Sequence, residues 1–199
     1  DPRGKTGLAL AYAVSPTGAD HLQHTHDPTF EKPSKWVEAL GITEGVSVDS
    51  LGPEKVRLFM YVQLWWGLLD CLGACKFIFI PHNAGLLNAS HLVELVNASA
   101  GWETSLWSLM KASERALTLA RCFNVREGFR AADDTLPSRL FEELLFGQRK
   151  GLKIDRQQFD AALRLYYEMM GWNRDTGIPD SAKLHELDLG WAAKQIDIA

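Results

Sequence analysis

The chain has 199 residues, of which 46% are hydrophobic and 23% are charged, and it carries a net charge of −4. This apolar share excludes a disordered chain, and the lack of a basic stripe argues against a nucleic-acid-binding protein. Three cysteines, an odd number, suit a reducing compartment such as the cytoplasm better than a disulfide framework. The longest apolar run is interrupted by Gln63 and Asp70, which favours a buried core helix over a membrane span.

The hydrophobic pattern predicts helices along the chain. We expect them, in order, at residues 5–14, 34–40, 53–69, 91–96, 102–123, 140–146, 155–170, 181–187 and 191–196. Residues 77–81 are too short a run to assign as helical or extended. No period-two alternation and no internal repeat occurs. We therefore predict an all-α fold, a multihelical orthogonal bundle around the central Trp/Leu-rich helix, forming a single domain over residues 1–199.

The clearest amphipathic helix is expected to open at Gly101-Trp102, because apolar or small residues then recur at steps of three and four. Its predicted inner face consists of Trp102, Leu106, Leu109, Ser113, Ala116, Ala120 and Phe123. We also expect the tryptophans at positions 65, 66, 102 and 107 to lie in the core.

The stretch from Asp70 to Lys76 ends the central apolar run with an acid, two thiols, a glycine and a lysine. A carboxylate at a helix C-terminus faces the negative end of the dipole, which costs roughly 0.3–1 kcal/mol. Asp70 should therefore reach water or hold a group that presents N–H donors. Gly73 permits a turn and the close approach of another group. Cys75 is a potential soft ligand for iron, whereas we expect Cys71 to be part of the core.

Residues 17–28 form a polar loop with three histidines, His21, His24 and His26. An imidazole with a pKa near 6.5 suits proton transfer close to neutrality. For any one of these histidines taken alone, however, a solvated polar loop is the simpler interpretation. The spacings of three and two residues do not match a helical ligand pair, and no cysteine lies nearby, so zinc binding is disfavoured.

Several phrases, taken together and in order, resemble one family. They are Asp1-Pro2-Arg3-Gly4, Gly18-Ala19-Asp20-His21, Asp70-Cys71-Leu72-Gly73-Ala74-Cys75, Asn124-Val125-Arg126-Glu127-Gly128-Phe129, Asp134-Thr135-Leu136-Pro137, Tyr166-Tyr167 and Gly177-Ile178-Pro179. The ordered set is similar to the C-terminal helical domain of tungsten-dependent aldehyde:ferredoxin oxidoreductases. Because the first residue is not Met, we expect the chain to be a segment of a longer protein or a processed chain.

The resemblance implies a tungsten (or molybdenum) bis-pterin cofactor with a neighbouring 4Fe–4S cluster. In the family's motif the aspartate binds the pterin ring and the last cysteine is the fourth cluster ligand, roles that would fall on Asp70 and Cys75. The alternatives are a carboxylate that caps or pairs locally and a buried, inert thiol. Gly73, Ala74 and Lys76 would border the cofactors. Ala74 departs from the motif, which has Leu there, although a main-chain contact would survive the change. Lys76 would tune the cluster potential or meet a phosphate, unless it is a surface lysine.

The resemblance also implies oxidation of a small-molecule aldehyde to a carboxylic acid, with ferredoxin as electron acceptor. His21 is the best match to the family's histidine near tungsten, and His24 and His26 are alternatives. The partners implied are ferredoxin and the N-terminal and middle domains of the longer chain, with no nucleic acid and no membrane. Two alternatives stay open: the tungsten subunit of a benzoyl-CoA-reductase-like enzyme, and a helical structural or interaction module that is catalytically silent in isolation.

Overall fold

A computed structural model describes residues 1–24, 26–32, 35–80 and 87–196. Eight α-helices are formed in these ranges: α1 (Gly7–Val14), α2 (Lys35–Glu38), α3 (Pro53–Leu72), α4 (Ala89–Ala100), α5 (Leu106–Arg126), α6 (Arg156–Met170), α7 (Ser181–Glu186) and α8 (Gly190–Ala193). The only β-type pairing in the described ranges is an isolated bridge between Trp172 and Pro179. The predicted all-α, multihelical class is confirmed.

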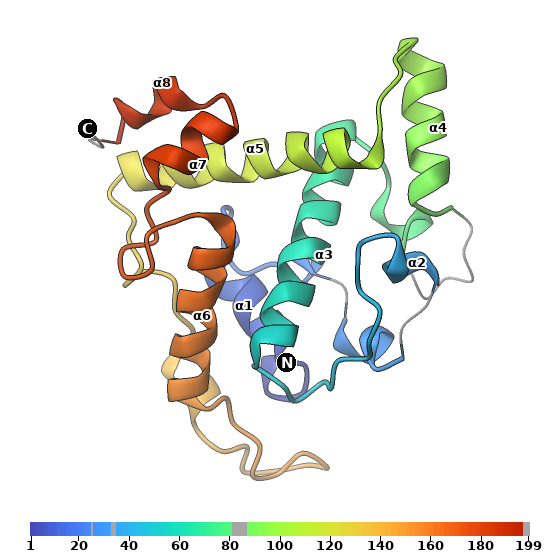
Figure 1. The fold of residues 1–199 in the computed structure, drawn as a ribbon. Coiled ribbons are helices and arrows are strands. Elements are labelled where there is room, and N and C mark those ends of the chain that lie inside the picture. The colour runs from blue at the N-terminus through green and yellow to red at the C-terminus, as the bar shows by residue number, and fades with distance from the viewer. Residues whose placement is uncertain (25, 33–34, 81–86, 197–199) are drawn as a thin grey trace.

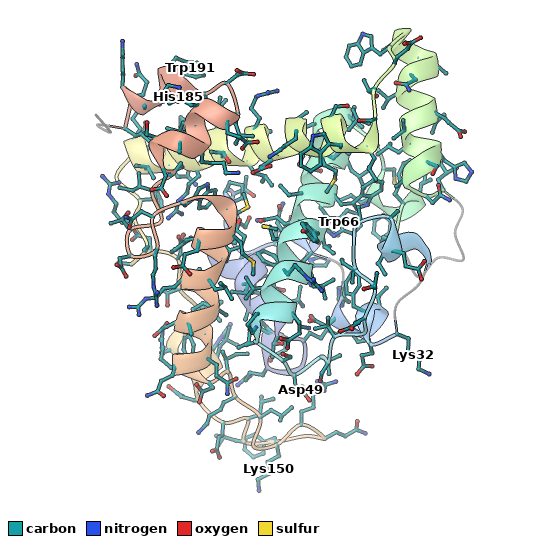
Figure 2. The ribbon with its side chains drawn as sticks, viewed as in Figure 1. Lys32, Asp49, Trp66, Lys150, His185 and Trp191 are labelled. Carbon is teal, nitrogen blue, oxygen red and sulfur yellow. The ribbon has the colours of Figure 1, made fainter. Side chains whose placement is uncertain are left out.

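Helix α3 stands in the middle of the molecule, with α6 along one side, α2 and α4 on the other, and α5 across one end (Figure 1). Twelve of its twenty residues are buried, and they include Trp65 and Trp66, the latter labelled in Figure 2. The helix is therefore covered on most of its circumference, as the long apolar run predicts.

The crossing of α3 and α5 depends on a small residue. A Cβ added at Gly67 would lie 2.6 Å from Ser113 Oγ, and that hydroxyl donates a 2.6 Å hydrogen bond to the carbonyl oxygen of Leu64. The two backbones can approach this closely only because position 67 has no side chain.

Both ends of α3 follow from local sequence. Pro53 stands in the first turn after the N-cap residue Gly52, where its missing N–H and fixed φ are tolerated. Gly73 ends the helix in the left-handed region, with φ 64°, which L-residues with side chains rarely adopt.

The predicted start of the long amphipathic helix is wrong. Gly101 ends α4 with φ 69°, and α5 begins only after Ser105, whose side chain accepts a hydrogen bond from the Ser108 N–H. Trp102 therefore lies outside the helix and is 58% exposed, and Trp107 is 72% exposed. The face of α5 that is buried consists of Leu109, Ser113, Glu114, Thr118, Arg121, Cys122 and Val125.

The expected helix at residues 140–146 is also wrong, because only a short 3₁₀ turn, Ser138–Phe141, forms there. Phe146 is 83% exposed. Elsewhere the predicted boundaries are close. Asn88 caps α4 and Asp155 caps α6, whereas Ser34, the first residue of the helix expected at 34–40, lies outside the described residues. A 3₁₀ turn, Lys76–Ile78, includes the first two residues of the unassigned run 77–81, and residue 81 lies outside the described residues.

The buried apolar residues form three clusters. The first packs α1, one side of α3 and α6, around Phe59 and Tyr166. The second packs α2, the other side of α3, α4 and the start of α5, around Trp65 and Trp66. The third lies between the end of α5 and helices α7 and α8, around Leu184. Helix α3 contributes to the first two clusters, and its C-terminal part packs into the second through Trp65, Trp66 and Leu69.

Candidate functional site

Asp70 lies in the last turn of α3 and reaches the surface. Its side chain is 54% exposed, and its Oδ2 lies 2.8 Å from Nζ of Lys76. The expectation that an acid at this position would reach water is met, and a local cation also compensates the unfavourable end of the helix dipole. The carboxylate is therefore accessible to a group from outside.

The two cysteines of the same stretch are both exposed, in contrast to Cys122, which is buried. The expectation that Cys71 belongs to the core is wrong, since it lies on the solvent side of the last turn of α3. Partial burial and the neighbouring Asp70 raise the pKa of the Cys71 thiol. A Cβ added at Gly73 would meet no atom within 4 Å, so the space beside the Gly73 backbone is open.

The turn that carries His21 follows from a local cap. The Asp20 carboxylate accepts a 2.9 Å hydrogen bond from the Leu22 N–H, which fixes the short 3₁₀ turn His21–Gln23. The His21 side chain is 61% exposed, with its Nδ1 3.7 Å from Asp20 Oδ1. Lys76 Nζ donates a 3.2 Å hydrogen bond to the Leu22 carbonyl oxygen. The structure therefore brings the His21 turn next to the Asp70–Lys76 stretch.

His24 lies inside the protein, 1% exposed. Its ring packs against Phe30 and Phe59, with ring centroids 5.9 and 5.4 Å away. Neither ring nitrogen has a hydrogen-bond partner among the described residues. Burial lowers the pKa of His24 to about 4, so the ring is neutral at physiological pH.

His26 differs from both. Its Nδ1 lies 2.5 Å from Nζ of Lys5, and its ring centroid is 6.3 Å from that of His21. Partial burial and the nearby Lys5 cation lower the pKa of His26. The three loop histidines are therefore in three different environments, which the sequence spacing alone did not distinguish.

A buried ion pair that the sequence pattern does not reveal fixes the C-terminal end of the histidine loop. Asp27 and Lys55 are both fully buried and paired with each other, and the Gly7 N–H donates a 3.0 Å hydrogen bond to Asp27 Oδ1. A Cβ added at Gly7 would lie 2.6 Å from Nε2 of His24. The start of α1, the histidine loop and the first turn of α3 therefore meet at one buried polar cluster.

A second buried network explains several phrases of the family resemblance. Arg121 donates to Asp134 Oδ1 at 3.0 Å and to the carbonyl oxygen of Gly177 at 2.8 Å. The Tyr167 hydroxyl donates to the same Asp134 carboxylate. The guanidinium lies 5.5 Å from the centroid of the Trp172 ring. The side chains of Arg121, Asp134 and Tyr167 are thus paired with one another inside the chain, so they stabilise the fold.

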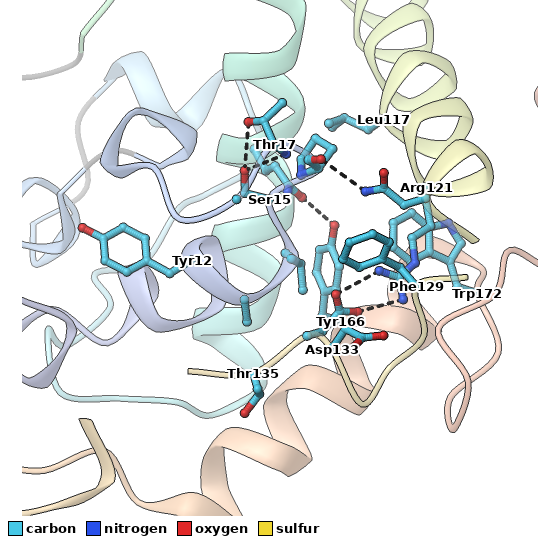
Figure 3. Close-up of a pocket in the computed structure, with 17 residues that line it drawn as sticks. Tyr12, Ser15, Thr17, Leu117, Arg121, Phe129, Asp133, Thr135, Tyr166 and Trp172 are labelled. Carbon is cyan, nitrogen blue, oxygen red and sulfur yellow. Dashed lines mark hydrogen bonds and ion pairs between the residues drawn. The ribbon is translucent and has the colours of Figure 1, made fainter. Parts of the chain in front are cut away.

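Next to this network lies a cavity of about 400 Å³ (Figure 3). The segment just before the His21 turn forms one wall, and Arg121 and Tyr166 lie opposite. The Tyr166 hydroxyl donates a 2.6 Å hydrogen bond to Gln63 Oε1, and burial strongly raises the pKa of Tyr166. The cavity lining therefore combines polar side chains such as Ser15 and Arg121 with aromatic ones such as Tyr166 and Trp172.

Within the described ranges, no group of three or more His, Cys, Asp or Glu side chains is arranged to hold a metal ion. A cluster bound through Cys75 would need its other ligands from elsewhere. None of the described helices has the length and apolar character needed to cross a membrane.

Comparison with known proteins identifies the class. The sequence profile of the family described as "Aldehyde ferredoxin oxidoreductase, domains 2 & 3" matches residues 1–189. The chain belongs to this family. It is 32% identical over 192 residues to a tungsten-containing aldehyde ferredoxin oxidoreductase of Pyrococcus abyssi, covering 95% of this chain and 29% of that protein.

A second relative supports the same assignment. A tungsten-containing aldehyde ferredoxin oxidoreductase of Thermococcus kodakarensis is 31% identical over 181 residues, covering 90% of this chain and 27% of the relative. The chain thus spans less than a third of the length of these relatives.

Among solved structures, the fold is similar to a chain of the active site complex BamBC of benzoyl coenzyme A reductase in complex with 1,5-dienoyl-CoA. The TM-score is 0.67 at 19% sequence identity, covering 95% of this chain and 31% of the other. At this identity the likeness concerns the fold alone.

Proposed function

We propose that this chain is the C-terminal part of a tungstopterin iron–sulfur enzyme that oxidises aldehydes to carboxylic acids and transfers the electrons to ferredoxin. Membership of the aldehyde ferredoxin oxidoreductase family supports the proposal. The observation that carries it is the accessibility of Asp70 and Cys75, which are exposed together where α3 ends. A purely structural helix end would have no need of an accessible acid and an accessible thiol five residues apart.

Asp70 would bind the pterin. The aminopyrimidinone edge of a pterin presents a ring N–H beside an exocyclic amine, and one carboxylate can accept both in a charge-assisted pair. The Asp70 side chain is 54% exposed, and the open space at Gly73 leaves room for a flat ring to approach the backbone. Ala74 would offer only its main chain there.

Cys75 would supply one ligand to a 4Fe–4S cluster. A thiolate is the usual ligand of such clusters, and Cys75 is exposed whereas Cys122 is buried. The other three ligands would come from another part of the longer protein. Lys76, directly after Cys75, would add a positive charge beside the cluster.

His21 would move a proton at the substrate. Its side chain is 61% exposed, whereas the ring of His24 is buried and Nδ1 of His26 is in contact with the Lys5 ammonium. The bound metal and pterins would supply the oxidation itself, and the His21 imidazole would accept or donate the proton. We therefore assign the acid–base role to His21 rather than to its two neighbours.

The proposal is tested by Cys75→Ala in the full-length protein that carries this chain, with Cys71→Ala as the matched control. Both thiols are exposed and four residues apart, so the two variants differ in ligation rather than in packing. We expect Cys75→Ala to lower the iron content, to change the cluster spectrum and to stop ferredoxin reduction. The control should retain all three. Normal iron content and an unchanged spectrum in Cys75→Ala would contradict the ligand assignment.

A benzoyl-CoA-reductase-like activity is the first alternative, favoured only by the fold likeness described above. Assays of the full-length protein with aldehydes and with an aromatic acyl-CoA distinguish the two reactions. The second alternative, a catalytically silent module, is addressed by metal analysis of the purified 199-residue chain. We expect neither tungsten nor iron in stoichiometric amounts, because Asp70 and Cys75 alone cannot hold either cofactor.

A further inference from the structure

The side chain of Lys76 lies between two parts of the candidate site. Its Nζ donates a 2.8 Å hydrogen bond to Asp70 Oδ2 and a 3.2 Å hydrogen bond to the carbonyl oxygen of Leu22. The ammonium also lies 5.7 Å from the centroid of the Trp66 ring. One cation therefore contacts the end of α3 and the turn that carries His21, 54 residues earlier in the chain.

The chain reversal at Gly73 makes this arrangement possible. Gly73 adopts φ 64°, and the Ala74 N–H donates a 2.9 Å hydrogen bond to the Leu69 carbonyl oxygen, which closes the end of the helix. Lys76 is thereby folded back beside Asp70. Its side chain is only 12% exposed, whereas that of Asp70 is 54% exposed. A lysine on an ordinary surface would keep its ammonium in water, so Lys76 is held in place.

We propose that Lys76 is a positioning residue that holds the His21 turn against the C-terminal end of α3. Asp20 orders the turn internally through its hydrogen bond to the Leu22 N–H. That bond lies within the turn and does not connect it to α3. The hydrogen bond from Lys76 Nζ to the Leu22 carbonyl oxygen makes this connection. Removing the ammonium should therefore loosen the turn while the rest of the fold stays intact.

The catalytic meaning of this contact rests on the proposed function. If His21 moves the proton and Asp70 binds the pterin, Lys76 fixes the position of one relative to the other. The contact itself does not depend on that function. It can be tested on the 199-residue chain without any cofactor, so the two ideas can fail separately.

The test is hydrogen–deuterium exchange of the purified chain, comparing the wild type with Lys76→Met. We expect the amides of Leu22 and Gln23 to exchange about three- to tenfold faster, the range for losing a partly exposed, charge-assisted hydrogen bond. Amides of α6 should keep their rates. Lys76→Arg, which retains a charged donor, should restore slow exchange. The control is Lys153→Met, because Lys153 is 50% exposed and pairs with Glu143 at 3.3 Å without contacting the turn.

The outcomes separate clearly. Acceleration confined to the turn in Lys76→Met, with rescue by Lys76→Arg and no effect of Lys153→Met, supports the proposal. Unchanged exchange at Leu22 and Gln23 overturns it. If Lys76→Met accelerates exchange throughout the chain, the variant Asp70→Asn tests the contact instead. That variant removes the charge that anchors Lys76, at an exposed position, and should accelerate exchange in the turn alone. No acceleration there also overturns the proposal.

Discussion

The buried imidazole of His24 should make the stability of this protein fall steeply below neutral pH. The ring is enclosed by Phe30 and Phe59 and has no hydrogen-bond partner among the described residues. Burial lowers its pKa from 6.5 to about 4. In the unfolded chain the same ring is in water and takes up a proton near pH 6.5.

The sign and the size of the effect follow from this difference. Between pH 6.5 and pH 4 the unfolded state binds a proton that the folded state does not bind, so acid favours unfolding. Above pH 6.5 the ring is neutral in both states and contributes no pH dependence. Within the window each pH unit costs about 1.4 kcal/mol. From pH 7.5 to pH 5.0, His24 should therefore remove about 2 kcal/mol of stability.

The variant His24→Phe isolates this contribution, because a phenyl ring fits the same aromatic site and cannot titrate. The assay is urea unfolding of wild type and variant at pH 8.5, 7.5 and 5.0. His26 and the carboxylates are present in both proteins, so their contributions cancel in the comparison. The difference in unfolding free energy should be constant between pH 8.5 and 7.5. At pH 5.0 it should move by about 2 kcal/mol in favour of the variant.

Equal losses in the two proteins between pH 7.5 and 5.0 would refute the reasoning. They would mean that the folded His24 ring accepts its proton as readily as the unfolded one. The aromatic enclosure would then be open to water or would contain a proton acceptor.

Two further predictions concern the buried ion pairs. Lys55→Met should cost about 3–5 kcal/mol of unfolding free energy, because it leaves the Asp27 carboxylate buried without its cation; a midpoint of urea unfolding close to that of the wild type would count against a buried pair. Asp134→Ala should cost a similar amount, because it leaves the buried Arg121 guanidinium without its carboxylate partner. Asp133→Ala, at the exposed neighbouring position, removes only the hydrogen bond from the Arg130 N–H and should cost about 0.5–1.5 kcal/mol. Equal losses in these last two variants would show that the pairing is not the cause.

Local patterns were sufficient for the elements whose boundaries depend on neighbouring residues. Pro53 and Gly73 mark the ends of α3 in the sequence, and Asp155 and Gly171 mark those of α6. In each case a cap or a left-handed glycine is a property of a few adjacent residues.

The start of α5 could not be predicted in this way. Steps of three and four extend backwards through Trp102, but Gly101 and Ser105 are also good stop and start signals. A helix that begins after Ser105 fits the composition as well as one that begins at Trp102. The outward position of Trp107 follows from the α3–α5 crossing at Gly67, a tertiary contact that periodicity does not contain.

The buried charges were missed for the same reason. A lysine in the first turn of a helix is by default a surface residue. Lys55 is buried only because Asp27, 28 residues earlier, is folded against it. At the candidate site, the sequence predicted that Asp70 would reach water or meet donors, and both hold, since it is exposed and paired with Lys76. Lys76 also contacts Leu22 because the chain reverses direction at Gly73. The spacing of residues in the sequence does not predict this contact.

The phrases that carry the family resemblance divide into two groups with different physical roles. Asp134, Tyr167 and Gly177 find their partners within this chain around Arg121. Asp70 and Cys75 lie at the surface. The groups should therefore respond differently to substitution in the full-length protein. Asp134→Ala should lower the unfolding free energy and reduce cofactor content only through loss of folded protein. Cys75→Ala should leave the unfolding of the isolated 199-residue chain unchanged and remove iron from the full-length enzyme. Lowered stability of the isolated chain in Cys75→Ala would assign that thiol to the fold instead.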